Sequence, residues 1–250
     1  MGIPVLVLGE SGSGKSCSLR NFNKEDVVIY NIAGKPLPFK KQLNKADNVN
    51  YTQIKSNMQK GNFKTYVIDD SQYLMAFEMF DRAKELGYNK FTDVALNFRG
   101  LVDFVIRNTP ADVIVYFLHH TETTDTGKIK AKTSGKMLDN QLTLEGLFSI
   151  VLLCKTDGQE HYFETQSDGY STCKSPMGMF DLKIDNDLKM VDDKIREYYE
   201  LNKKEENKMS LQRKIERNNL KKAWKKHNEG VAKKYRADFK GFWHWYKERR

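Results

Sequence analysis

Residues 9–16 read Gly9-Glu10-Ser11-Gly12-Ser13-Gly14-Lys15-Ser16 and fit the pattern G-x-x-x-x-G-K-[ST] in full. Glycines permit backbone conformations that other residues avoid, so that successive N–H groups can converge on phosphate oxygens. The pattern predicts that Lys15 lies along the β- and γ-phosphates of a nucleotide and that the Ser16 hydroxyl ligates Mg²⁺. We expect the whole loop, together with Cys17, to contact the nucleotide. The alternative is a flexible Gly/Ser turn.

The segments on either side of this loop are those that a phosphate-binding loop requires. The apolar run Ile3–Leu8 predicts a buried strand, and the residues from Lys15 to about Phe22 predict a helix. Further strands are predicted over 27–32, 65–68, 112–118, 148–154 and 161–165, and further helices over 71–86, 92–108 and 185–201. This alternation predicts an α/β fold with a mostly parallel sheet flanked by helices.

A second acidic signature follows the third predicted strand, where Tyr66-Val67-Ile68 leads into Asp69-Asp70. Apolar strand residues followed by an acid form the Walker B pattern, in which the acid holds Mg²⁺. We assign this metal role to Asp69. We assign Asp70 to the attacking water, although both aspartates have the alternative role of capping the helix that begins at Ser71.

Two adjacent histidines, His119 and His120, end the fourth predicted strand. Ligands of parallel sheets gather at the carboxyl ends of the strands, so a histidine there can contact the γ-phosphate or the water. We choose His119 as the catalytic one by a narrow margin over His120. The alternative is a pair of structural histidines with local hydrogen bonds.

Residues 121–136 are polar, contain two glycines, and are predicted to form a mobile loop. Its lysines are suited to neutralising nucleic-acid phosphates without reading sequence, and they are Lys128, Lys130, Lys132 and Lys136. Lys136 has a second possible role, which is to stabilise charge on the nucleotide of a neighbouring subunit. The alternative is a solvated basic loop.

The positive charge is concentrated at the C-terminal end of the chain. The 250 residues carry a net charge of +9, but residues 203–250 hold 17 of the 42 Lys and Arg and 6 of the 33 Asp and Glu. We therefore divide the chain into a globular domain, residues 1–201, and a basic helical tail, residues 202–250. The tail carries a narrow apolar stripe from Leu220 to Tyr246, which suits packing, single-strand binding or a membrane surface, in that order.

The chain resembles the phage-encoded, RecA-like AAA-family ATP-binding proteins of phage recombination modules, some of which are described as single-strand annealing proteins. The resemblance covers residues 1–201. It rests on the phosphate-loop pattern and on residues 67–74, 116–121, 127–138, 144–148 and 174–180. It implies a RecA-like P-loop NTPase core, ATP and Mg²⁺ as ligands, a homo-oligomer, and single-stranded DNA as partner. A phage single-strand binding protein is a further implied partner.

The sequence departs from RecA in one place that matters for chemistry. RecA has a catalytic glutamate just after its second strand, whereas Ile32 is followed here by Ala33-Gly34-Lys35-Pro36, with no acid. Either Asp70 takes the catalytic role or hydrolysis is slow. The leading hypothesis is a DNA-stimulated ATPase of phage recombination or annealing. The alternatives are an ATP-binding loader or scaffold with little turnover and, less favoured, a nucleotide kinase.

Composition favours a cytoplasmic protein, in the bacterial host if the chain is phage-encoded. There are three cysteines without a CxxC pair, which argues against a disulfide scaffold or a zinc site. No apolar run approaches the length of a membrane span, and the N-terminus has no basic segment of a signal peptide. We therefore expect no membrane partner.

Overall fold

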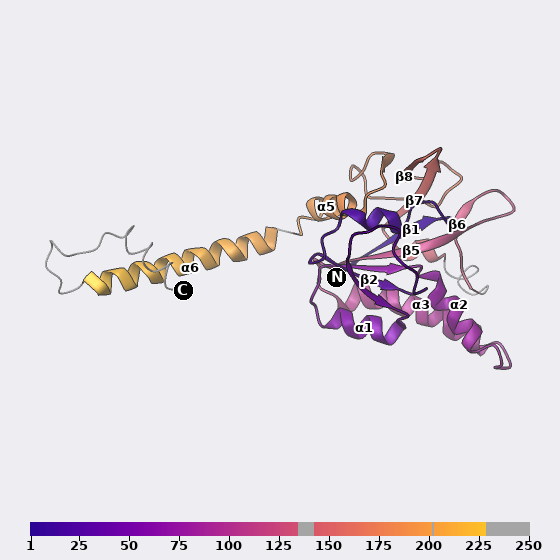
Figure 1. The fold of residues 1–250 in the computed structure, drawn as a ribbon, viewed down its shortest axis with the longest axis horizontal. Coiled ribbons are helices and arrows are strands. Elements are labelled where there is room, and N and C mark those ends of the chain that lie inside the picture. The colour runs from indigo at the N-terminus through magenta and orange to yellow at the C-terminus, as the bar shows by residue number, and fades with distance from the viewer. Residues whose placement is uncertain (135–142, 202, 229–250) are drawn as a thin grey trace. The chain divides into compact units, whose positions relative to one another are not determined.

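The computed structural model describes residues 1–134, 143–201 and 203–228 (Figure 1). The chain divides into two units, Met1–Tyr199 and Glu200–Arg250, close to the boundary predicted after residue 201. The described part of the second unit is one helix, α6 (Lys203–Asn228), in which Leu220 is buried. The part of the predicted apolar stripe beyond residue 228 lies outside the described residues.

The first unit is built on a single sheet, in which the described residues form nine strands. The strand order is β3-β2-β4-β5-β1-β7-β8-β9, with β6 paired to β5. The strands are β1 (Ile3–Gly9), β2 (Val27–Asn31), β3 (Asn44–Asp47), β4 (Thr65–Asp69), β5 (Ile114–Thr123), β6 (Ile129–Ala131), β7 (Ile150–Asp157), β8 (Glu160–Glu164) and β9 (Lys183–Asp185). The six strands from β3 to β7 in this order pair in parallel, and β6, β8 and β9 pair antiparallel to their neighbours.

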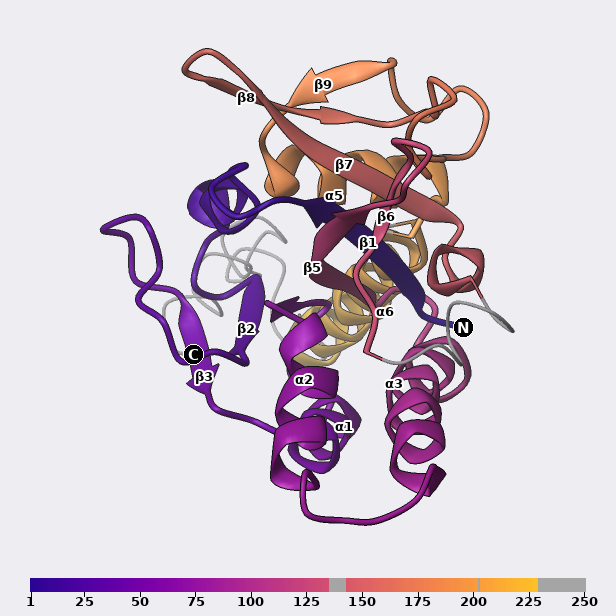
Figure 2. The same cartoon turned by 90° about the vertical axis from the view of Figure 1, so that its right-hand side faces the viewer.

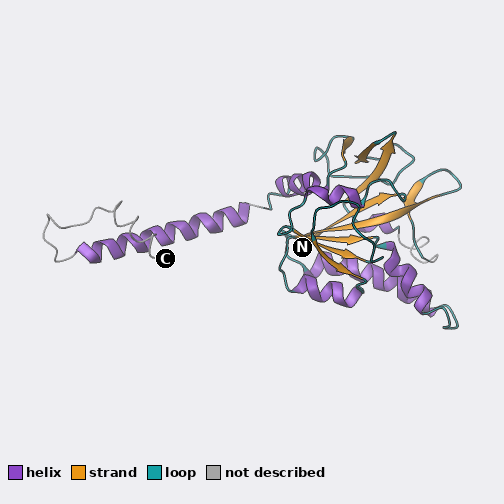
Figure 3. Cartoon of the chain, in the orientation of Figure 1, coloured by secondary structure: helices purple, strands orange, loops and turns teal. Residues whose placement is uncertain are grey.

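Helices cover both faces of this sheet (Figures 1 and 3). Three helices lie on one face: α1 (Tyr51–Gln59), α2 (Gln72–Asp81) and α3 (Asn89–Asn108). The other face carries α5 (Leu188–Tyr198) and the short 3-10 helix η1 (Ser16–Asn21), which contact each other. A second 3-10 helix, η2 (Leu144–Leu147), precedes β7. The predicted α/β class with a mostly parallel, helix-flanked sheet is therefore confirmed.

The main core lies between the sheet and the three-helix layer, which Figure 2 shows from the side. Phe98 of α3 packs on Phe117 of β5 with ring centroids 6.1 Å apart, and Phe117 meets Phe148 at 5.4 Å. All three rings are almost completely buried. Burying a side chain of this size stabilises the fold by roughly 1.5–3 kcal/mol, so these contacts fix α3 on the centre of the sheet.

Some elements differ from the sequence prediction. The strand β3 and the helix α1 were not predicted. The strand lies at the sheet edge, is polar with alternating partial exposure, and has no apolar run. A local signal existed for α1, since Asn50 and Gln53 form a reciprocal capping box at its N-terminus. The helix predicted after Lys15 is a six-residue 3-10 helix. There the Ser18 hydroxyl donates to the Lys15 carbonyl in competition with α-helical bonding.

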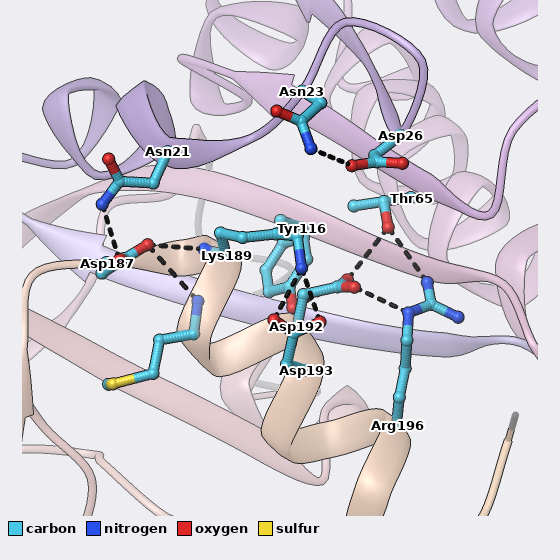
Figure 4. Close-up of polar contacts among 11 residues, drawn as sticks. Asn21, Asn23, Asp26, Thr65, Tyr116, Asp187, Lys189, Asp192, Asp193 and Arg196 are labelled. Carbon is cyan, nitrogen blue, oxygen red and sulfur yellow. Dashed lines mark hydrogen bonds and ion pairs between the residues drawn. The ribbon is translucent and has the colours of Figure 1, made fainter.

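A buried ion pair anchors α5 beneath the amino ends of β4 and β5 (Figure 4). The Arg196 guanidinium donates to Asp192 at 2.7 Å and also to the Thr65 hydroxyl and the Asp112 carbonyl. The other Asp192 oxygen accepts from the Thr65 and Tyr116 hydroxyls at 3.0 and 3.3 Å. Every polar group in this network is paired, which is what permits charges to be buried.

Helix α5 is also joined to η1, the 3-10 helix that follows the phosphate-loop segment in the sequence. Asp187 caps α5 by accepting from the backbone of Lys189, and it accepts a 2.7 Å hydrogen bond from Asn21 (Figure 4). Arg20 donates to the Asn186 carbonyl at 2.6 Å. The position of η1 therefore depends on how α5 is held.

Within the described residues, no helix has both the length and the apolar character needed to cross a bilayer.

Candidate functional site

The register of the sheet brings the predicted site residues to one edge. Gly9 at the end of β1 pairs with His120 of β5, and Asn31 at the end of β2 pairs with Asp69 of β4. These are carboxyl ends of parallel strands, where loops and side chains of α/β folds form ligand sites. The phosphate-loop segment, the two aspartates and one of the two histidines therefore meet at a common cleft.

The segment between β1 and η1 needs its glycines for identifiable reasons. Gly12 and Gly14 have φ angles of +82° and +100°, a region that other residues rarely adopt. At Gly9 a Cβ atom would lie 2.4 Å from the Ser13 hydroxyl oxygen, so a side chain does not fit. Within the described chain, the backbone N–H groups of Gly12, Gly14 and Lys15 donate to no carbonyl, and the buried Ser13 hydroxyl has no partner.

Lys15 folds back over this segment. Its ammonium group donates to the carbonyls of Gly9 and Glu10 at 2.7 and 2.8 Å, and the residue is almost fully buried. Burial lowers the pKa of Lys15, which nearby Cys154, Asp70 and Asp69 oppose. The lysine is thus held by weak neutral acceptors that an incoming anion can replace.

Two donors from the sheet fix the segment from below. The Cys154 thiol of β7 donates to the Ser13 carbonyl at 2.8 Å, and the His161 Nδ1 of β8 donates to the same oxygen at 2.8 Å. Burial raises the pKa of Cys154 to about 11, so it remains a protonated donor. Neither residue was selected from the sequence, because the β7–β8 pairing that brings them here is long-range.

Asp69 is the buried partner of the loop. Its Oδ1 accepts a 2.9 Å hydrogen bond from the Ser16 hydroxyl, 53 residues earlier in the chain. Burial, together with the neighbouring Asp70 carboxylate, raises the pKa of Asp69 to about 6, although Ser16 and Lys15 oppose this shift. The two residues that the sequence assigned to Mg²⁺ are therefore in direct contact.

Asp70 faces the cleft with a different environment. Its φ angle is +61°, which is unusual for a residue other than glycine and is found at functional turns. One carboxylate oxygen lies 2.9 Å from the Lys35 ammonium and the other 3.2 Å from the His120 Nε2. Although burial alone would raise it, the hydrogen bonds from His120 and Lys35 bring the pKa of Asp70 down to about 2.

The capping alternative does not apply to Asp70. The N-cap position of α2 is occupied by Ser71, whose side chain makes no capping hydrogen bond. The Asp70 carboxylate points instead to Lys35 and His120. This carboxylate is therefore part of the cleft.

The choice of His119 over His120 is corrected by the structure. His119 is completely buried, its Nε2 donates to the Lys132 carbonyl at 2.7 Å, and its Nδ1 accepts from the Ser71 hydroxyl at 2.8 Å. Burial, opposed by the Lys132 contact, lowers the pKa of His119 to about 4 and keeps the ring neutral. Because strand β5 runs on through both histidines, their side chains alternate, and His120 is the one that reaches the cleft.

The cleft has a volume of about 240 Å³. Its lining includes six residues of the predicted binding segment: Ser11, Gly12, Gly14, Lys15, Ser16 and Cys17. Gly9, Glu10 and Ser13 support this lining without forming part of it. The remaining lining residues are Asp69, Asp70, His120, Asn31, Lys35, Pro36 and Pro38, and the last four were not selected from the sequence. Their signal was their place at the end of a buried parallel strand, in the case of Asn31, or in the segment that follows it.

The predicted mobile loop after β5 is instead a β-hairpin as far as the described residues extend. Thr121–Thr123 pair antiparallel with Ile129–Ala131, because Ile129 and Ala131 pack on the core and fix the register. Lys128, Lys130 and Lys132 alternate with these apolar residues along the strand and so share the opposite side. Lys130 pairs with Glu122 at 2.8 Å, while Lys128 and Lys132 are exposed.

Lys136 lies outside the described residues. The basic hairpin, defined here as Lys128, Lys130 and Lys132, is connected to the cleft through β5. The Lys132 N–H donates to the His120 carbonyl at 2.9 Å, and the Lys132 carbonyl accepts from His119. The two histidines thus link the hairpin and the cleft from adjacent positions.

Comparisons with known proteins add no relative. No family model matches the chain, and no curated protein matches it.

Proposed function

We propose that residues 1–201 form a RecA-like P-loop ATPase that binds ATP with Mg²⁺ and acts on single-stranded DNA in phage recombination or annealing. The observation that carries this proposal is the 2.9 Å hydrogen bond between Ser16 and Asp69 at the cleft. It joins the end of the phosphate-loop pattern to the acid of the Walker B pattern, which are the two groups that share the metal in such enzymes.

The residues at the cleft fit a nucleoside triphosphate. Backbone N–H groups without a carbonyl partner and a lysine on replaceable acceptors supply donors for phosphate oxygens. Ser16 and Asp69 supply the oxygen ligands that Mg²⁺ prefers. When bound, Mg²⁺ neutralises charge that develops on the phosphates during transfer.

Asp70 is the residue placed to orient the attacking water. In the proposed reaction, the water oxygen bonds to the γ-phosphorus, the bond from that phosphorus to the β–γ bridging oxygen breaks, and ADP and phosphate leave. The water proton passes to the Asp70 carboxylate and then to solvent or phosphate. His120 steadies this carboxylate through its 3.2 Å contact.

The second candidate function is an ATP-binding loader or scaffold with little turnover. One observation favours it, namely that Asp70 lies between two cationic or donor groups, Lys35 and His120. A carboxylate whose pKa is about 2 is a weak base toward water. Under this alternative the nucleotide binds and orders the protein, and hydrolysis contributes little.

The experiment that separates the two functions is ATP hydrolysis by the purified chain, measured with and without single-stranded DNA. The ATPase proposal expects turnover that DNA stimulates, and loss of both turnover and stimulation in Lys15→Ala. ATP binding without DNA-dependent turnover supports the loader or scaffold. Absence of nucleotide binding in the unmodified chain would reject both functions.

The basic hairpin is expected to provide the DNA contact. Replacing Lys128, Lys130 and Lys132 together with alanine should weaken single-stranded DNA binding and reduce the slope of log K against log salt by about 2, because each lost phosphate contact contributes about 0.7. The measurement is a salt titration of DNA affinity by fluorescence anisotropy.

A matched control uses three exposed lysines away from the hairpin, Lys24, Lys60 and Lys84, replaced together with alanine. The net charge changes equally in both triple variants, so a general charge effect appears in both. An equal loss of affinity and slope in the two variants would contradict a hairpin contact.

A further inference from the structure

Lys35 lines the cleft, and the proposed ATPase reaction gives it no role. It follows β2 in the turn Gly34-Lys35-Pro36, at the place where RecA carries an acid. Gly34 has a φ angle of +67°, and the buried Asn31 side chain donates to the Lys35 carbonyl at 2.6 Å. The backbone of Lys35 is therefore fixed by the fold, while its side chain is 60% exposed and able to reorient.

The side chain of Lys35 lies over groups that a substrate would approach. Its ammonium is 2.9 Å from Asp70 Oδ2 and 5.2 Å from the centre of the Tyr73 ring. It lines the same cleft as Gly12, Gly14 and Lys15. Beside burial, which is the larger cause, the nearby charge of Lys35 also lowers the pKa of Lys15. The cleft thus has two lysines, one on the phosphate loop and one facing it across the aspartates.

We propose that Lys35 is a second phosphate-binding lysine, which leaves its ion pair with Asp70 to bind the terminal phosphate of a nucleoside triphosphate. This inference rests on the proposed function, because it needs a nucleotide in the cleft. Lys35 acts here as a residue that discriminates triphosphate from diphosphate.

The position of Lys35 explains why the terminal phosphate is its target. Ser16 and Asp69 mark the metal end of the loop, and Asp70, which holds Lys35, is the next residue beyond Asp69. We expect a diphosphate that fills the loop to stop short of this pair. Only a further phosphate brings negative charge against Lys35, and a phosphate presents more acceptor oxygens and charge than one carboxylate.

The exchange has a consequence for Asp70. In the structure its two carboxylate oxygens are held by Lys35 and His120. Departure of Lys35 leaves one of these oxygens free to accept a hydrogen bond from a water beside the terminal phosphate.

The test is a comparison of affinities for Mg²⁺ with ADP and for Mg²⁺ with a non-hydrolysable ATP analogue, measured by calorimetry on the full chain. Lys35→Ala is expected to weaken analogue binding about tenfold and ADP binding less than about twofold, as for loss of one charge-assisted contact. Lys35→Arg keeps the charge and should restore most of the analogue affinity. Lys189→Ala, which removes a half-buried lysine paired with the exposed Asp193, is the control and should change neither affinity.

A second variant tests the exchange itself. Asp70→Asn frees Lys35 from its competitor, so analogue affinity should rise several-fold, and this gain should shrink when Lys35→Ala is also present. An equal loss of ADP and analogue affinity in Lys35→Ala, or no loss, would overturn the inference while leaving ATP binding intact. If the unmodified chain binds neither ligand, the proposed function fails and the inference with it.

Discussion

Replacing Asp192 with alanine is expected to lower the free energy of unfolding by about 3–5 kcal/mol, the range seen when one partner of a buried ion pair is removed. The change leaves the Arg196 guanidinium, which is 9% exposed, without its 2.7 Å partner. It also takes the acceptor away from the buried hydroxyls of Thr65 and Tyr116. Each unsatisfied buried group adds to the cost.

The neighbouring residue on the same helix provides a matched control. Asp193 makes an exposed i,i+4 ion pair with Lys189 at 2.6 Å, which contributes about 0.3–0.5 kcal/mol. Denaturant unfolding of Asp192→Ala, Asp193→Ala and the unmodified chain compares the two positions directly. Similar midpoints for the two variants would show that the buried network does not stabilise α5.

The effect of Asp192→Ala should extend to the nucleotide cleft. Helix α5 is fixed by Asp192 and Arg196 at one end, and its N-cap residue Asp187 is bonded to Asn21 of η1 at the other. The loop that carries Lys15 leads directly into η1. A loosened α5 therefore removes support from one side of the loop, and nucleotide affinity should fall along with stability.

The sequence predicted the central part of the fold because its signals are local. The apolar runs that became β1, β2, β4 and β7 are buried on both faces, so they read as strands without knowledge of their neighbours. Asp69 and Ser16 were predicted to bind the same metal ion, because the phosphate-loop and Walker B patterns each identify their residues from local sequence alone. The polar edge strand β3 had no such signal.

Other site residues were beyond sequence reasoning because their roles depend on register and long-range pairing. One residue of uncertainty at the end of β5 exchanges His119 for His120, and thereby a buried structural histidine for one in the cleft. At Lys35 the sequence showed only that an acid is absent. The pairing of β2 with β4 is what brings the Lys35 ammonium within 2.9 Å of Asp70.

Replacing Asp69 with asparagine is expected to stabilise the nucleotide-free protein at pH 7 by about 3 kcal/mol and to reduce ATP hydrolysis by at least about 100-fold. Asparagine keeps the shape of the side chain and an oxygen that accepts from Ser16. It removes a buried carboxylate whose pKa is raised to about 6 by desolvation and by Asp70. Under the proposed function, the fold gives up stability here in order to keep a metal ligand.

The pH dependence of this difference identifies its cause. The pKa of Asp69 is about 6 in the folded protein, whereas an aspartate in an unfolded chain has a pKa of 3.8. Ionisation therefore costs folding free energy progressively between these values, and stability from this group falls as pH rises. The stability advantage of Asp69→Asn should be near zero below pH 4, grow through pH 4–6, and level off at about 3 kcal/mol by pH 7.

Denaturant unfolding of both proteins across this pH range, without nucleotide or Mg²⁺, measures the difference. Asp125→Asn, at an exposed turn, serves as the control for the substitution itself and should show only a small difference. Under the proposed function Mg²⁺ with ATP binds only the ionised form, so adding both should stabilise the unmodified chain and leave Asp69→Asn little changed. If the difference in unfolding free energy is constant across pH, burial does not raise the pKa of Asp69. If Asp69→Asn retains hydrolysis, Asp69 is not a metal ligand.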